Sequence, residues 1–187
     1  MASYSNIVLG AGNLWINATT GAALPADTVA KGGSFGGTWV DLGYTDGIQS
    51  NISIEVKDVE VDQSTMDVRS YITKQEVMIE AKLAEATLAN LKYALGFGTL
   101  STSGSTAVLQ MGDNPALTEY SIAAEGQSPN LNAAFRRVNL YRVRPQADVE
   151  IVASRTDQTL WAVRFKALLY TSGSAGNNVA QIRDYTA

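Results

Sequence analysis

The residue types that carry most enzyme and metal chemistry are missing from this chain. It contains no histidine and no cysteine, which excludes zinc–thiolate sites, a cysteine nucleophile and a Ser-His-Asp triad. The commonest general acid–base residue at neutral pH is therefore absent as well. Catalysis by carboxylates alone stays open, but no pair of carboxylates is singled out. We therefore predict a protein that is not an enzyme and that has no cofactor, no metal and no small-molecule substrate.

One run of carboxylates has regular spacing: Asp58, Glu60 and Asp62. A calcium loop would need glycine at its sixth position and glutamate at its twelfth, and Gln63 and Arg69 stand there. On a strand, the three carboxylates would instead lie along one face about 7 Å apart. Such a face is either solvated or meets basic residues.

The clearest basic cluster consists of four arginines: Arg136, Arg137, Arg142 and Arg144. Phe135 and Tyr141 interleave with them, as in proteins that bind single-stranded nucleic acid. The whole chain has a net charge of −4, however, and one strand divides the arginines between two faces. We therefore favour ion pairs with the acidic strand of Asp58, Glu60 and Asp62, within one chain or between copies, over nucleic-acid binding.

The segment Gly10-Ala11-Gly12 begins like a dinucleotide-binding fingerprint. Trp15 replaces the glycine that the fingerprint requires at its sixth position, and no helical pattern follows. The glycines are therefore interpreted as a strand bulge.

The elements that must position these residues are organised around Trp39–Gly96. After Gly47 the sequence alternates, which predicts a long strand with one apolar face and one polar face. The apolar set is Ile52, Ile54 and Val56, and the polar set is Ser53, Glu55 and Lys57. The alternation changes parity near Lys57-Asp58, which predicts a bulge or bend there.

A polar loop and a second strand follow, and then a helix. Tyr71–Leu83 places Val77, Ile79, Ala81 and Leu83 on one face and Met78, Glu80 and Lys82 on the other. A leucine face at helical spacing predicts a helix over 84–95, closed by Gly96. Leu83 and Ala84 offer no capping oxygen at its start.

The remaining sequence predicts further strands and irregular segments. Residues 18–37 are rich in turn formers and are interpreted as a long loop, and the residues after Gly96 as a small-residue linker. Val149–Ala153 and Trp161–Ala167 are expected to form a second hairpin. Residues 1–5 and 171–187 are expected to be extended arms, the second either disordered or ordered on a neighbouring molecule.

Together these elements predict a mainly β, single-domain protein over residues 1–187. The expected fold is a β-sandwich or barrel of about eight strands with one flanking α-helix. The start of the chain lacks the pattern of a signal peptide and no apolar run is long enough for a membrane helix, so we expect synthesis in the cytosol and no membrane partner.

Three segments also resemble a known family. They are WVDLGYTDG (Trp39–Gly47), VKDVEVDQSTMDVR (Val56–Arg69) and LAEATLANLKYALG (Leu83–Gly96). In content and order they are similar to the major tail proteins of long-tailed bacteriophages, which are the subunits of the tail tube. The resemblance is close over roughly a third of the chain, and it rests on packing and turn motifs.

The resemblance implies a structural protein that assembles with itself. Such subunits form rings, commonly hexameric, that stack into a tube around a tape measure protein, and phage DNA later passes through the lumen. The protein would then be a virion component of the tail, assembled in the host cytoplasm. Closure of sheets between subunits would also remove exposed strand edges.

The resemblance also assigns positions. The loop between the two long strands would reach the adjacent ring; it comprises Gln63, Ser64, Thr65, Met66, Asp67, Val68 and Arg69. The lumen would be lined either by Ser53, Glu55 and Lys57 or by Met78, Glu80 and Lys82. An acidic or neutral lumen would let DNA slide, because it repels backbone phosphates.

Two other functions remain open from the sequence. An adhesive or carbohydrate-binding β-sandwich would use exposed aromatic residues, with Trp15, Trp39 and Tyr44 as candidates. An enzyme acting through a carboxylate pair is the third possibility.

Overall fold

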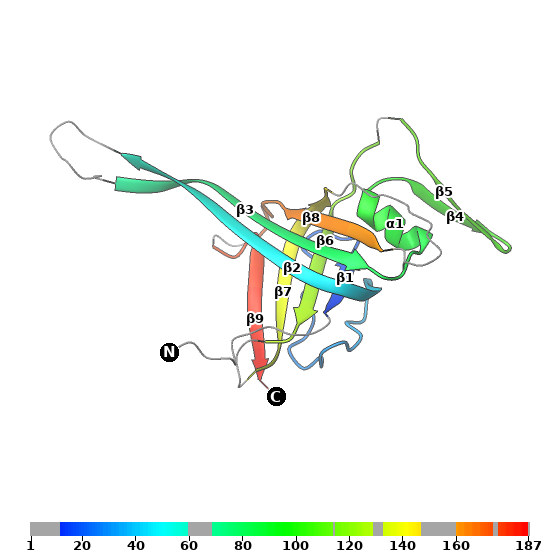
Figure 1. Ribbon diagram of the computed structural model, residues 1–187, viewed down its shortest axis with the longest axis horizontal. Helices are drawn as coiled ribbons and strands as arrows, with labels where there is room; N and C mark the ends of the chain where they lie inside the picture. The colour runs from blue at the N-terminus through cyan, green and yellow to red at the C-terminus, as the bar shows by residue number, and fades with distance from the viewer. Residues whose placement is uncertain are drawn as a thin grey trace.

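The computed structural model describes residues 12–59, 69–113, 115–128, 133–146, 160–173 and 176–186. These residues form nine strands and one helix, which confirms the mainly β fold with a single helix on its flank (Figure 1). The elements are β1 (Asn13–Asn17), β2 (Trp39–Val59), β3 (Arg69–Leu83), α1 (Leu88–Leu95), β4 (Thr99–Ser103), β5 (Thr106–Gln110), β6 (Tyr120–Gly126), β7 (Ala133–Pro145), β8 (Trp161–Ala167) and β9 (Ala180–Thr186).

Seven strands form one antiparallel sheet in the order β6-β1-β2-β3-β8-β7-β9, and β6 also pairs with β7. Because β6 has both β1 and β7 as neighbours, the sheet closes on itself and leaves β9 as an additional strand on β7. The closed part encloses the hydrophobic core, which includes Leu14, Ile16, Leu42, Ile79 and Phe165. Closure removes most of the strand edges that would otherwise be exposed.

The hairpin of β2 and β3 is longer than the closed sheet needs. Val77, Ile79, Ala81 and Leu83 of β3 are buried, as the alternation predicts. Beyond them, residues 51–59 of β2 and 69–75 of β3 are all exposed. These two stretches form an arm that projects away from the rest of the molecule (Figure 1).

The arm contains a bulge, but not the one that the change of parity predicts at Lys57-Asp58, where β2 and β3 pair without a break. Glu55 pairs with Lys74 and Val56 pairs with Ile72, so Thr73 is an extra residue on β3. The Thr73 hydroxyl donates to the carbonyl oxygen of Glu55 at 3.1 Å. The bulge therefore lies just before Lys57-Asp58 in register, and its extra residue belongs to the partner strand.

The helix begins later than predicted, at Leu88 and not at residue 84. Thr87 is its N-cap, and the Thr87 side chain accepts a hydrogen bond from the backbone N–H of Asn90. The predicted start was wrong because the capping oxygen lies four residues further along the chain. Gly96 ends the helix in the left-handed conformation, with its N–H bonded to the carbonyl of Lys92, as expected.

A second hairpin projects beside α1, on the side away from the arm (Figure 1). It consists of β4 and β5, which pair only with each other among the described strands. The small-residue linker predicted after Gly96 therefore contains a strand that the sequence analysis missed, because its serines and threonines gave no apolar alternation.

Candidate assembly surfaces

One face of the arm is apolar and exposed. Ile52, Ile54 and Val56 of β2 lie on it with Ile72 of β3, and these four side chains are 49%, 52%, 55% and 61% exposed. Ile52 pairs directly with the buried Val77, so this row continues the core-facing side of the sheet beyond the core. A row of large apolar side chains in solvent marks an interaction surface.

The opposite face of the arm is polar and continues across three strands. Register pairs Ser53 with Glu76 and Gln49 with Glu80, so β2 and β3 present these side chains to the same side. The two sets proposed from sequence for the lumen, Ser53/Glu55/Lys57 and Met78/Glu80/Lys82, therefore lie on one face. We call it the polar face. Arg164 and Lys166 of β8 extend it, because they pair with Glu80 and Met78.

Cross-strand ion pairs order the polar face. Lys74 lies 3.0 Å from Glu55 and 3.4 Å from Glu76, and Lys166 lies 2.6 Å from the other oxygen of Glu76. The hydrogen bond to Glu55, helped by Glu76, raises the pKa of Lys74 above its ordinary value. The hydrogen bond from Lys166 lowers the pKa of Glu76. Glu76 is thus held between two lysines.

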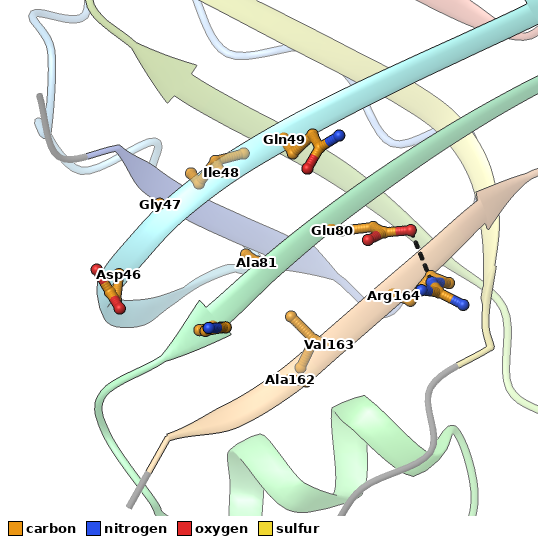
Figure 2. Close-up of a pocket in the computed structure, with 10 residues that line it drawn as sticks. Asp46, Gly47, Ile48, Gln49, Glu80, Ala81, Ala162, Val163 and Arg164 are labelled. Carbon is orange, nitrogen blue, oxygen red and sulfur yellow. Dashed lines mark ion pairs between the residues drawn. The ribbon is translucent and has the colours of Figure 1, made fainter. Parts of the chain in front are cut away.

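A hollow of about 370 Å³ opens where β2, β3 and β8 run side by side (Figure 2). Ala81, Ala162 and Gly47 keep it open because their side chains are small or absent. At its rim Glu80 and Arg164 point toward one another and form an ion pair at 2.7 Å. Lys82 and Asp46 also line the hollow.

Within the described ranges, no group of three or more acidic side chains is placed to hold a metal ion. Also within those ranges, the structure contains no helix long and apolar enough to cross a membrane.

Most of the loop predicted to contact an adjacent ring lies outside the described residues. This applies to residues 63–68 and also to Glu60 and Asp62. Arg69 is described: it begins β3, is exposed and pairs with Val59. Asp58 pairs with Ser70, which places it on the apolar side of the arm.

Three of the four clustered arginines pair with carboxylates of their own chain, and none of these is Asp58. Arg142 lies 2.6 Å from Glu119, and Arg136 lies 2.7 Å from Asp184 of β9. The hydrogen bond from Arg136 lowers the pKa of Asp184. Arg144, the fourth, pairs in register with Lys166 and therefore belongs to the polar face.

Arg137 and Glu125 form a fully buried ion pair. Both side chains are 0% exposed, and the guanidinium nitrogen lies 2.6 Å from the carboxylate oxygen. The guanidinium carbon also lies 4.7 Å from the ring centres of Phe35 and Tyr185, and 5.4 Å from that of Phe135. A buried charge needs this many partners, because each ion loses its hydration.

This ion pair fixes the long loop predicted over residues 18–37. Arg137 donates to the carbonyl of Val29, and the N–H of Gly32 donates to the second oxygen of Glu125 at 2.8 Å. Phe35 stacks on Trp15 at 4.5 Å between ring centres. The loop is therefore packed on the closed sheet of its own chain.

The C-terminal segment helps to hold the same loop. Arg183 of β9 pairs with Asp27 of the loop at 2.6 Å, and Tyr185 stacks on Phe135. The sequence analysis expected an arm that is disordered or ordered on a neighbour. Residues 180–186 are extended, but they pair with β7 of the same chain, an arrangement that the analysis did not consider.

The aromatic residues proposed for carbohydrate binding do not form one platform. Trp15 is buried. Trp39 is half-buried, and its indole N–H donates to the carbonyl of Ala23. Tyr44 alone of the three is highly exposed, at 80%.

A family model identifies the family to which the chain belongs. The sequence model of the phage tail tube proteins matches residues 1–178. The chain belongs to the phage tail tube protein family. This confirms the resemblance seen in the sequence and gives the protein a structural role in the virion tail.

The crystal structure of an Hcp protein aligns over 95% of this chain and 100% of its own, at 8% identity and a TM-score of 0.38. No curated protein sequence matches the chain.

The sequence analysis missed two features of this tail tube protein's surface. It gave Ile52, Ile54 and Val56 as an apolar face but not as an exposed one, although the apolar alternation continues for more residues than the closed sheet buries. It also did not place Arg164 and Lys166 on the polar face. The alternation within WAVRFKA, Trp161–Ala167, is the signal that would have found them.

Proposed function

We propose that this protein assembles with itself into rings, most simply hexamers, which stack to form the tail tube that conducts phage DNA. A tape measure protein would occupy the lumen during assembly in the host cytoplasm, and the function would be structural and not enzymatic. The observation that carries this proposal is the apolar face of the arm. Family membership supports the tube, and the arm supplies a surface from which to build it.

The apolar face needs a partner surface. Four large side chains, each about half exposed, lie in one row on a projecting hairpin. Burying each of them would contribute roughly 1 kcal/mol or more, because such a side chain is worth about 1.5–3 kcal/mol when fully buried. A neighbouring copy is the partner present in stoichiometric amount.

The edges of the arm favour the same partner. β1 pairs with β2 only up to Tyr44, and β8 pairs with β3 only from Met78 onward. The backbone groups of the arm beyond these residues face outward on both sides. Free edges are templates for pairing with another chain, so neighbouring arms would join into a continuous sheet.

We propose that residues 63–69 at the end of the arm contact the next ring. We also propose that some of the charged residues predicted from the sequence form ion pairs between copies. Arg136, Arg137 and Arg142 have carboxylate partners inside the chain. Arg144 has no carboxylate partner among the described residues but lies on the polar face. Of the predicted set, we therefore propose Asp58, Glu60 and Asp62 as the charges that meet a neighbouring copy.

A pair of matched variants tests the proposal. Ile54→Lys places a charge on the apolar face, and Ser53→Lys places the same charge on the polar face one residue away. In negative-stain images the wild type and Ser53→Lys are expected to form rings or tubes. Ile54→Lys is expected to stay monomeric by gel filtration with an unchanged circular dichroism spectrum.

Two results would count against self-assembly through the arm. One is a wild type that remains monomeric at high concentration under all conditions tried. The other is Ile54→Lys forming tubes as readily as Ser53→Lys does. Deletion of residues 63–68 separates the two kinds of contact, because we expect it to leave single rings while preventing their stacking.

A further inference from the structure

The polar face has the opposite charge to the rest of the molecule. Seven basic residues occupy its register positions: Lys57, Arg69, Lys74, Lys82, Arg144, Arg164 and Lys166. Three acidic residues share it, namely Glu55, Glu76 and Glu80, and Asp46 stands at its end beside the hollow. The chain as a whole carries 14 basic and 18 acidic residues. Half of its basic residues therefore lie on one face of a chain that is acidic overall.

The acidic residues of this face are already engaged. Glu55 and Glu76 pair with Lys74, Glu76 also pairs with Lys166, and Glu80 pairs with Arg164. Among the described residues, Lys57, Lys82, Arg69 and Arg144 make no ion pair. Within the described part of the chain, these four cations are therefore available to an external anion.

The chemistry of the face favours a polyanion over another protein. Protein interfaces have an apolar core, and on this hairpin the exposed row of isoleucines and Val56 lies on the opposite face. The polar face presents Gln49, Asn51 and Ser53 between its cations, and its exposed apolar side chains on the arm are Val59 and Tyr71. Such a surface makes electrostatic contacts that water can mediate, as at nucleic-acid backbones.

We propose that the polar face binds the phosphate backbone of double-stranded DNA through its unpaired cations. The choice of DNA as the polyanion rests on the proposed function, in which DNA passes this face. The polar face carries a net positive charge, whereas the sequence led us to expect an acidic or neutral lumen. The ion-paired carboxylates moderate the attraction, so binding is weak, independent of base sequence and strongly dependent on salt.

The salt dependence gives a quantitative expectation. Each phosphate contact contributes about −0.9 to the slope of log K against log salt concentration, so four unpaired cations give a slope of about −3.6. A contact whose contribution vanishes near 1 M salt is worth about eightfold in affinity at 0.1 M. Removal of one cation should therefore weaken binding about eightfold and make the slope shallower by about one.

The experiment uses the full chain, kept monomeric by dilution, and a fluorescent 30-base-pair duplex of random sequence. Fluorescence anisotropy is measured from 0.05 to 0.3 M salt. Lys82→Gln and Arg144→Gln are each expected to weaken binding about eightfold and to make the slope shallower by about one. Lys92→Gln removes the same charge from α1, away from the face, and is expected to bind as the wild type does. Thermal unfolding confirms that each variant is folded.

A variant that is expected to bind DNA more tightly serves as a further control, because misfolding would only weaken binding. Glu80→Gln frees Arg164 and is expected to bind the duplex more tightly, with a steeper slope. The proposal is overturned by a wild type that does not bind at 0.05 M salt, or by Lys92→Gln weakening binding as much as Lys82→Gln. It is also overturned if polyglutamate binds with this pattern of variants while the duplex does not, because the partner is then an acidic protein. The proposed function is tested separately, by whether the wild type forms tubes in negative-stain images, so its failure can be told apart from a failure to bind DNA.

Discussion

At the scale of single residues, the most unusual feature of the core is the fully buried ion pair of Arg137 and Glu125. The ion pair, one backbone carbonyl and three aromatic rings converge on one guanidinium. Alternation along β7 explains why Arg137 is buried while Arg136 is not, since neighbouring residues face opposite sides of a strand. The sequence placed both in one cluster and could not tell which side would be covered, because the covering loop has no periodic pattern.

Replacement of Arg137 by methionine should strongly destabilise the protein. Glu125 would remain buried without its cation, and breaking a buried pair in this way costs about 3–5 kcal/mol. Urea denaturation measures the change. The double variant Arg137→Met/Glu125→Leu should regain most of the loss, because it removes both charges.

Arg136→Met is the matched control. Its partner Asp184 is partly exposed, and an exposed pair contributes no more than about 1 kcal/mol. Equal losses for the Arg136 and Arg137 variants would show that the buried pair does not anchor the loop.

At the scale of elements, periodic segments were predicted well and unpatterned ones were not. The alternation of β2 up to Lys57 and that of β3 gave their faces correctly, since a strand buried on one side must alternate. The start of α1 was misplaced because Ala84 and Leu88 share helical spacing, while the cap at Thr87 decides where the helix begins. β4 was missed because its serines and threonines show no apolar alternation. The contacts of residues 18–37 depend on partners far along the chain, and local sequence does not encode those partners.

The cap of α1 gives a prediction for one element. Thr87→Ala removes the oxygen that accepts the Asn90 N–H and should cost about 1 kcal/mol. Ser105→Ala, in the exposed turn between β4 and β5, should change stability by less than about 0.5 kcal/mol. Chemical denaturation compares the two, and no loss for Thr87→Ala would show that tertiary packing alone fixes the helix start.

At the scale of the whole molecule, β9 connects the closed sheet to the long loop of residues 18–37. It pairs with β7, supplies Asp184 to Arg136 and Tyr185 to Arg137, and holds Asp27 through Arg183. It therefore stabilises the closed sheet and the long loop together.

Deletion of residues 180–186 should lower the melting temperature markedly. A loss of about 4 kcal/mol corresponds to about 8–16 °C in a chain of this size, and differential scanning calorimetry measures it. As a control of similar length, residues 102–107 of the separate β4–β5 hairpin are replaced by Asn-Gly, which should have a much smaller effect. An unchanged melting temperature after loss of β9 would mean that this strand contributes only to contacts between copies.

The distances in sequence that these contacts span have a consequence for synthesis on the ribosome. Val29 meets Arg137 across 108 positions, and Asp27 meets Arg183 across 156. At about 5–20 residues per second, the loop would wait roughly 8–30 s for its last partner to be made. These contacts therefore form only after Arg183 has been made, so a nascent chain that lacks this residue would not yet present a finished subunit to its neighbours.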